Sequence, residues 1–135
     1  MSQLEIRSLG LKAPTRMKLG VAIHGGLSSA KVEKLLRVSG WNKSQLFQWA
    51  HIPPANGHKR FKAGRFGDHE SERIARLARV FDAADDMLRS PQRAAEWMVQ
   101  ANARLGDVAP VEAIGTELGA AEVEALIGQM RHGVF

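Results

Sequence analysis

The residues with the clearest chemical potential lie in the basic segment "ANGHKRFKAGR", residues 55–65. Lys and Arg neutralise phosphates or bind guanine edges, and an Asn amide pairs with adenine. The preceding break, "QWAHIPPAN", has the length of the turn in a helix-turn-helix motif. We therefore expect the helix after the break to face DNA bases and the helix before it to cross the phosphate backbone. The candidate DNA-binding residues are Lys43, Ser44, Asn56, His58, Lys59, Arg60, Lys62 and Arg65.

Two features of this segment leave alternatives open. Gly57 in mid-helix costs about 1 kcal/mol relative to Ala, so it indicates either a close backbone approach or an imperfect helix. The basic residues could also form an ordinary solvated face. The glycine-spaced stretch "GHKRFKAGRFG" lacks the Gly-Lys-Ser/Thr ending of a phosphate-binding loop and follows no expected strand, so a nucleotide site is not expected.

No constellation in the sequence indicates catalysis or metal binding. Asp85 and Asp86 are neighbours that point in different directions on a helix, so they do not bracket one substrate. The chain has no Cys, and His24, His51, His58 and His69 have no histidine at helical spacing. We therefore expect no catalytic residues, no cofactor and no metal, and we expect His51 to close the turn.

The charge of the 135-residue chain is divided unevenly. The net charge of +5 arises from twelve Lys and Arg against four Asp and Glu in residues 1–70, and seven against ten in residues 71–135. This division of +8 and −3 favours a polyanion-binding half and a second half with another role. A chance division on a solvated surface is the alternative. Without a membrane-spanning or secretory segment, a cytoplasmic protein is expected.

The periodicity of apolar residues predicts an all-α fold of about seven short helices. Residues 1–15 show no period and are expected to form an arm, and no strand is expected. Ser28 or Ser29, Asn42, Ser90 and Thr116 are expected N-caps, and Pro54 is expected to open a helix. The helices are expected at about 16–23, 29–38, 43–50, 54–63, 70–88, 91–101 and 117–131, with a single helical turn at 110–114.

The longest expected helix, residues 70–88, has a regular apolar stripe, and its polar residues are expected on an outer face. The helix after it is expected to bury Trp97 together with Ala94 and Met98. The expected outer-face residues are Arg73, Arg76, Arg79, Asp82, Asp85 and Asp86.

From residue 64 onward the chain resembles antitoxins of the Xre/MbcA/ParS type. The resemblance is carried by "GRFGDHESERIARLARV", "SPQRAAEWM", "NARLGDVAPVEAI" and "GTELGAAEVEALIGQMRHGVF". Ala103 replaces a proline of the family pattern, Asp107 a glycine and Phe66 a leucine. The basic half is similar, more loosely, to the Xre-like helix-turn-helix of that family. The resemblance implies an N-terminal arm and DNA-binding domain in residues 1–66 and a small helical toxin-binding domain in residues 67–135.

The same resemblance implies a type II toxin–antitoxin pair. Its partners would be a toxin of the RES fold that degrades NAD and operator DNA, which a homodimer binds within a larger complex. The sequence ends "IGQMRHGVF", and a glycine can turn the chain away from a helix axis. The aromatic ring would then fill the toxin's active site, unless it folds back on its own domain. The implied toxin-binding residues are Arg131, His132, Gly133, Val134 and Phe135.

A second function stays open on the sequence alone. The chain could be a helix-turn-helix transcription regulator whose C-terminal half only dimerises. The glycine followed by an aromatic residue favours the antitoxin, because a dimerisation helix does not need it.

Overall fold

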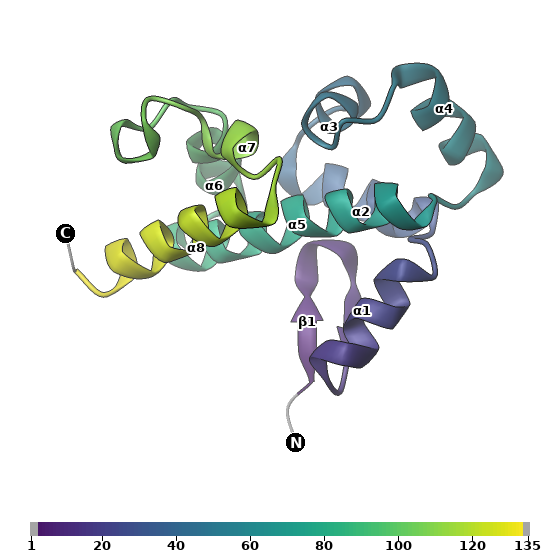
Figure 1. Cartoon of the computed structure of the whole chain (residues 1–135), viewed down its shortest axis with the longest axis horizontal. Coiled ribbons are helices and arrows are strands. Elements are labelled where there is room, and N and C mark those ends of the chain that lie inside the picture. The colour runs from purple at the N-terminus through teal and green to yellow at the C-terminus, as the bar shows by residue number, and fades with distance from the viewer. Residues whose placement is uncertain (1–2, 134–135) are drawn as a thin grey trace.

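A computed structural model describes residues 3–133 and shows a predominantly helical protein (Figure 1), so the expected all-α class is confirmed. A two-stranded antiparallel hairpin precedes the helices, with the short 3-10 turn η1 between its strands, and a second 3-10 turn, η2, lies between α6 and α7. None of the helices in residues 3–133 combines the length and apolar character needed to cross a bilayer. The elements are β1 (Leu4–Ile6), η1 (Arg7–Leu9), β2 (Leu11–Ala13), α1 (Arg16–His24), α2 (Ser29–Ser39), α3 (Lys43–Trp49), α4 (Pro54–Ala63), α5 (Asp68–Leu88), α6 (Pro91–Met98), η2 (Ala103–Leu105), α7 (Pro110–Ala113) and α8 (Glu117–Arg131).

The hairpin β1–β2 contradicts the expectation of an irregular arm without strands. Leu4 pairs with Ala13 and Ile6 with Leu11, and η1 and Gly10, with a positive φ of 65°, connect the two strands. Leu9 at the tip is fully buried in the core. Burial of these apolar side chains fixes the segment, although each strand is too short to show a period.

The expected helix starts are confirmed by their capping bonds. The Asn42 side chain accepts the N–H of Gln45 at 2.8 Å, and the Gln45 side chain accepts the N–H of Asn42 at 3.0 Å. Such reciprocal bonds satisfy backbone donors that a helix start leaves free. Ser90 and Thr116 also accept N–H bonds as N-caps, and Pro54 opens α4. The main difference in length is α6, which ends at Met98 and not near residue 101.

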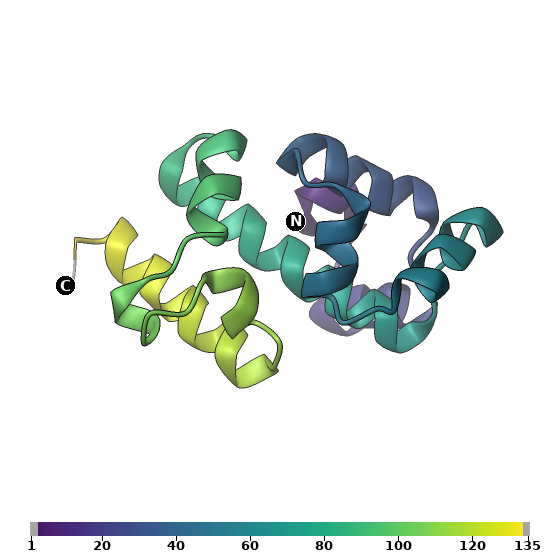
Figure 2. The same cartoon turned by 90° about the horizontal axis from the view of Figure 1, so that it is seen from above.

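The central helix α5 is enclosed on several sides, so the expected outer face is wrong for Arg73, Arg76 and Asp82, whereas Asp86 is exposed. Asp82 is only 8% exposed and accepts the backbone N–H of Ser8 at 3.2 Å. Arg73 donates from Nε to the carbonyl oxygen of Ala50 at 2.6 Å. Figure 2 shows the reason, because other helices lie along both ends of α5. Its polar side chains therefore reach backbone groups and charges on neighbouring elements.

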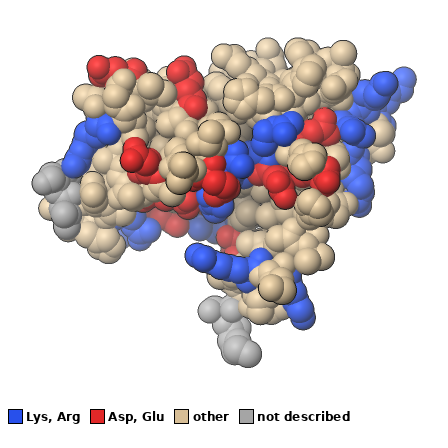
Figure 3. Space-filling view, in the orientation of Figure 1, with Lys and Arg blue, Asp and Glu red and all other residues tan. Residues whose placement is uncertain are grey.

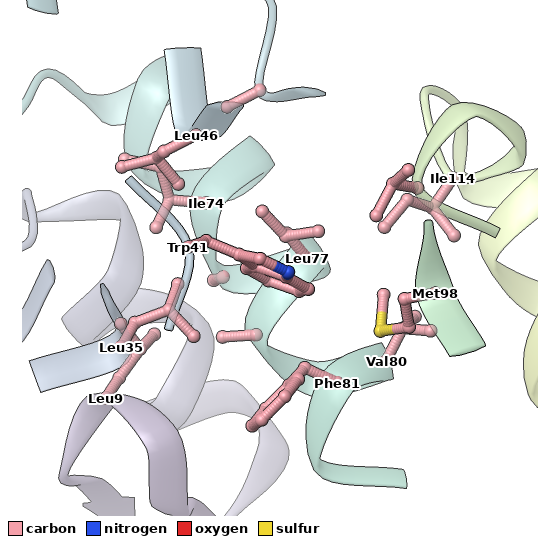
Figure 4. Close-up of a cluster of buried hydrophobic side chains, with 14 of the residues drawn as sticks. Leu9, Leu35, Trp41, Leu46, Ile74, Leu77, Val80, Phe81, Met98 and Ile114 are labelled. Atoms are coloured by element: carbon pink, nitrogen blue, oxygen red, sulfur yellow. The ribbon is translucent and has the colours of Figure 1, made fainter. Parts of the chain in front are cut away.

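One hydrophobic core runs through both halves of the chain (Figure 4). Leu35 and Trp41 from the N-terminal half meet Leu77 and Phe81 of α5, and Met98 and Ile114 continue the cluster. Ala94 and Met98 are buried as expected, whereas Trp97 is only half-buried and packs against this core. The predicted division between residues 66 and 67 falls at the start of α5 and stays a prediction.

Candidate functional site

The first candidate site is the pair of helices α3 and α4. A side chain at Gly57 would collide with the Phe47 ring, so the absence of a Cβ lets α4 approach α3 closely. Helix α4 runs from Pro54 to Ala63 without interruption, which supports the close approach over an imperfect helix. His51 lies in the turn between the helices with a φ of 55°, as expected for a residue that closes it. The structure therefore shows two short helices that pack closely and are joined by a short turn.

The exposed side chains of α4 form a basic surface. With 3.6 residues per turn, Lys59 and Lys62 lie opposite the buried Gly57, and Asn56 and His58 flank them. All four side chains are exposed. Figure 3 shows Lys and Arg gathered at the end of the molecule that α4 occupies. The structure therefore brings four of the predicted DNA-binding residues onto one accessible helix surface.

Two other predicted DNA-binding residues already have partners in the protein. Arg60 donates from Nε to Glu70 Oε1 at 2.8 Å, and the same oxygen accepts the N–H of Gly67 at 2.8 Å. Arg65 donates from a terminal nitrogen to the carbonyl oxygen of Gly26 at 2.6 Å. These bonds brace α4 against the start of α5 and the connection between α1 and α2. Sequence reasoning missed this bracing role.

The remaining two predicted DNA-binding residues lie at the start of α3. Lys43 places its Nζ 4.2 Å from the centre of the Phe61 ring, and Ser44 is exposed. A cation over an aromatic face is attracted by the ring quadrupole. This contact positions the Lys43 ammonium beside the C-terminal half of α4, on the side that faces α3.

The second candidate site is built on α8. Ala120, Val123, Leu126 and Ile127 bury one side of this helix against the core. A side chain at Gly119 would collide with the carbonyl oxygen of Ala113, so the glycine permits tight packing of the turn before α8.

Arg76 of α5 holds the start of α8. Its terminal nitrogen donates to the carbonyl oxygen of Gly115 at 3.2 Å, and its Nε donates to Glu117 Oε1 at 3.0 Å. This hydrogen bond is the main cause that lowers the pKa of the Glu117 carboxyl below its ordinary value. We call these Arg76 hydrogen bonds the Arg76 clamp, because they fix the start of α8 and so the orientation of its outer surface.

A groove of about 470 Å³ lies between α8 and η2. Leu118 at one end is 82% exposed, and Ala121 and Ala125 leave the middle open. Sequence reasoning did not find this groove, although Leu118 lies off the apolar stripe of the helix and could have signalled it. The lining residues are Arg104, Leu105, Leu118, Ala121, Glu122, Ala125, Leu126 and Gln129.

The segment after α8 begins as the sequence predicts. Arg131 is the last residue of the helix, and His132 and Gly133 are exposed. Gly133 has a φ of 67°, the left-handed conformation that turns a chain away from a helix axis. The other two predicted toxin-binding residues, Val134 and Phe135, lie outside the described residues.

Comparison with known proteins identifies the class to which these surfaces belong. Residues 83–133 match the family described as the antitoxin Xre/MbcA/ParS C-terminal toxin-binding domain. This range holds the last turns of α5, all of α6 to α8 and the whole groove. The C-terminal part is therefore a toxin-binding domain of an antitoxin, which disfavours a role in dimerisation alone.

Two curated relatives extend the similarity to nearly the whole chain. The protein is 33% identical over 130 residues to the antitoxin Xre of Photorhabdus laumondii subsp. laumondii, covering 95% of this chain and 88% of that protein. It is 36% identical over 131 residues to the antitoxin Xre of Yersinia enterocolitica, covering 96% and 88%. The chain belongs to the Xre/MbcA/ParS-type antitoxin family, and its expected partner is a cognate toxin.

Proposed function

We propose that this antitoxin neutralises a RES-fold, NAD-degrading toxin by inserting residues 131–135 into the toxin's active site. The observation that carries the proposal is the left-handed Gly133, exposed at the end of the last helix of a toxin-binding domain. A chain that turns there is directed away from its own helix. Phe135 then occupies the cleft where an adenine or nicotinamide ring binds, as an aromatic anchor in a pocket.

The side chains beside the turn are accessible, because Arg131 and His132 are exposed at the end of α8. A cleft that holds a pyrophosphate is cationic and repels Arg131, so we expect this side chain to lie at the rim of the cleft once the tail is seated. Helix α8 positions the tail, and the Arg76 clamp fixes the helix.

The test compares the full chain, the Phe135→Ala variant and a chain cut after Arg131, each in a purified complex with the toxin. We expect the cut chain to bind the toxin and to leave much of its NAD consumption intact, with Phe135→Ala intermediate. Complete inhibition by the cut chain would show that the tail is not the plug. A partner that consumes no NAD in any state would refute the RES assignment.

The proposal includes repression of the antitoxin's own operon through α3 and α4. Lys59, Lys62, Asn56 and His58 face the DNA, and Lys43 and Ser44 contact its backbone, while Arg60 and Arg65 brace the helices. Because helix-turn-helix proteins read paired half-sites, a homodimer is the binding form. An apolar surface suited to dimerisation exists on α1, where Met17 and Val21 are 81% and 68% exposed.

Binding to DNA upstream of the operon tests this part. We expect Lys59→Ala with Lys62→Ala to weaken binding and to make the salt dependence shallower by about two ion equivalents, because each lysine displaces about one counterion. Lys18→Ala, an exposed lysine of α1, is the matched control. If the full chain does not bind the upstream DNA at low salt, the helix-turn-helix does not act as a repressor.

A further inference from the structure

The groove between η2 and α8 has the form of a docking site for a helix. Its long wall is the row Leu118, Ala121, Ala125 and Gln129, which spans three turns of α8 or about 16 Å at 1.5 Å per residue. Ala121 and Ala125 are one turn apart and exposed, so a ridge of another helix can approach the α8 backbone there.

The floor and the end of the groove are apolar. Leu105 of η2 is half-buried and Leu126 of α8 is buried, so these leucines already have partners within the protein. Leu118 is 82% exposed and contributes an apolar side chain with little cover. Arg104 and Glu122 also line the groove, so it carries one basic and one acidic side chain. A partner that fits has apolar residues along one face and polar residues beside them.

The position of the groove identifies the partner. All its lining residues fall within the toxin-binding range 83–133, and none comes from the N-terminal half. The η2 turn and the end of α8 lie at the same end of the molecule in both views (Figures 1 and 2), so a partner in the groove also lies near the end of α8.

We propose that this groove binds the apolar face of an amphipathic helix on the surface of the toxin. The groove contributes to the affinity for the toxin, whichever part of the antitoxin inhibits the toxin. This inference rests on the toxin-binding role of the family domain. It does not depend on the proposed RES chemistry or on insertion of the tail.

The test measures the affinity of the full chain for the purified product of the neighbouring toxin gene, by calorimetry or surface plasmon resonance. Ala121→Arg and Ala125→Arg each place a long side chain in the middle of the groove. Both positions are exposed, so the melting temperature of the free protein should hardly change. We expect each variant to weaken binding at least tenfold, mainly through faster dissociation, and to leave inhibition complete at saturating antitoxin. Ala22→Arg, an exposed alanine of α1, is the matched control and should bind as the unaltered chain does.

Two outcomes would overturn the proposal. One is an affinity within twofold of the unaltered chain for both groove variants. The other is a change in the oligomeric state of the free antitoxin without a change in toxin affinity, because the groove would then bind a second copy of the chain. Combining Ala125→Arg with the cut after Arg131 separates the two proposals. Full inhibition by the cut chain refutes only the proposal that the tail blocks the active site. Tight toxin binding by the double variant refutes only the proposal that the groove binds the toxin.

Discussion

The ring of Phe47 lies directly against the backbone of Gly57 and occupies the space in which a side chain at position 57 would begin. Both residues are buried between the two helices of the helix-turn-helix. The spacing of α3 and α4, and so the presentation of Lys59 and Asn56, depends on this contact.

Replacing Gly57 with Ala should destabilise the protein by roughly 1–3 kcal/mol, as overpacking of a core does. The better helix propensity of Ala does not compensate, because the ring has to move or the helices have to separate. Urea unfolding measures the effect, and DNA affinity should fall as well. Gly20→Ala is the control, since a Cβ there meets nothing within 4 Å. Equal stabilities of the two variants would mean that the contact is not tight.

Two glycines of α8 should respond in opposite ways to the same substitution. Gly119→Ala forces a Cβ into the carbonyl oxygen of Ala113 and should displace the turn between α7 and α8. Gly128→Ala meets nothing within 4 Å and should stabilise the helix by about 0.4–1 kcal/mol. Melting temperatures of the two variants check this directly. Toxin binding should weaken only for Gly119→Ala, and a stabilising Gly119→Ala would contradict the structure.

The raised pKa of the buried Asp82 carboxyl predicts that the free energy of unfolding depends on pH. Burial raises the pKa of its carboxyl above the ordinary value, against the opposing effect of the Ser8 hydrogen bonds. The folded protein therefore holds this proton more tightly than the unfolded chain does. As pH rises from the ordinary Asp pKa through the raised folded pKa, the contribution of this group to stability falls.

Asp82→Asn removes this titration and keeps an oxygen that accepts the Ser8 N–H. We expect the variant to gain stability relative to the unaltered chain as pH rises from 3 to 7, as measured by urea unfolding at each pH. A difference that is constant across this range would show that Asp82 does not titrate in the folded protein with a raised pKa.

The lowered pKa of the Glu117 carboxyl predicts the opposite pH dependence of the free energy of unfolding. The Arg76 hydrogen bond lowers the pKa of this carboxyl, so its contribution to stability is present above the ordinary Glu pKa and is lost as pH falls through the folded pKa. Glu117→Gln should therefore destabilise the protein at pH 7 and have little effect near pH 2.5. Glu33→Gln, an exposed carboxylate of α2, serves as the control. An equal effect of Glu117→Gln at both pH values would exclude the ionic contribution.

The helix starts could be predicted from sequence because their causes are local. Asn42 and Gln45 form their reciprocal cap within one turn, and Ser90 and Thr116 each accept one backbone N–H within the first turn of their helices. The hairpin could not be predicted, because three residues per strand show no period and their stability comes from burial of Leu9 beneath α2 and α5.

The polar face of α5 was misinterpreted for a related reason. A single amphipathic stripe describes a helix that packs on one side, whereas α5 is contacted on several sides. Arg73, Arg76 and Asp82 bind groups that are far away in the sequence. The sequence likewise identified the basic residues of α4, but it could not distinguish the exposed Lys59 from Arg60, which Glu70 holds from the next helix.

Helix α5 also limits how the N-terminal half and the toxin-binding domain can be exchanged between relatives. Its first turn receives Arg60, its middle accepts Ser8 and its later turns carry the packing surface for α6 and α8. A chimaera joined between residues 66 and 67 takes this helix from one parent only. One side of α5 then packs against a segment from the other parent, whose side chains do not match it. A successful exchange therefore has to include the residues on one side of α5 together with the segment that packs on them. A simple fusion of two partial sequences should yield poorly folded hybrids.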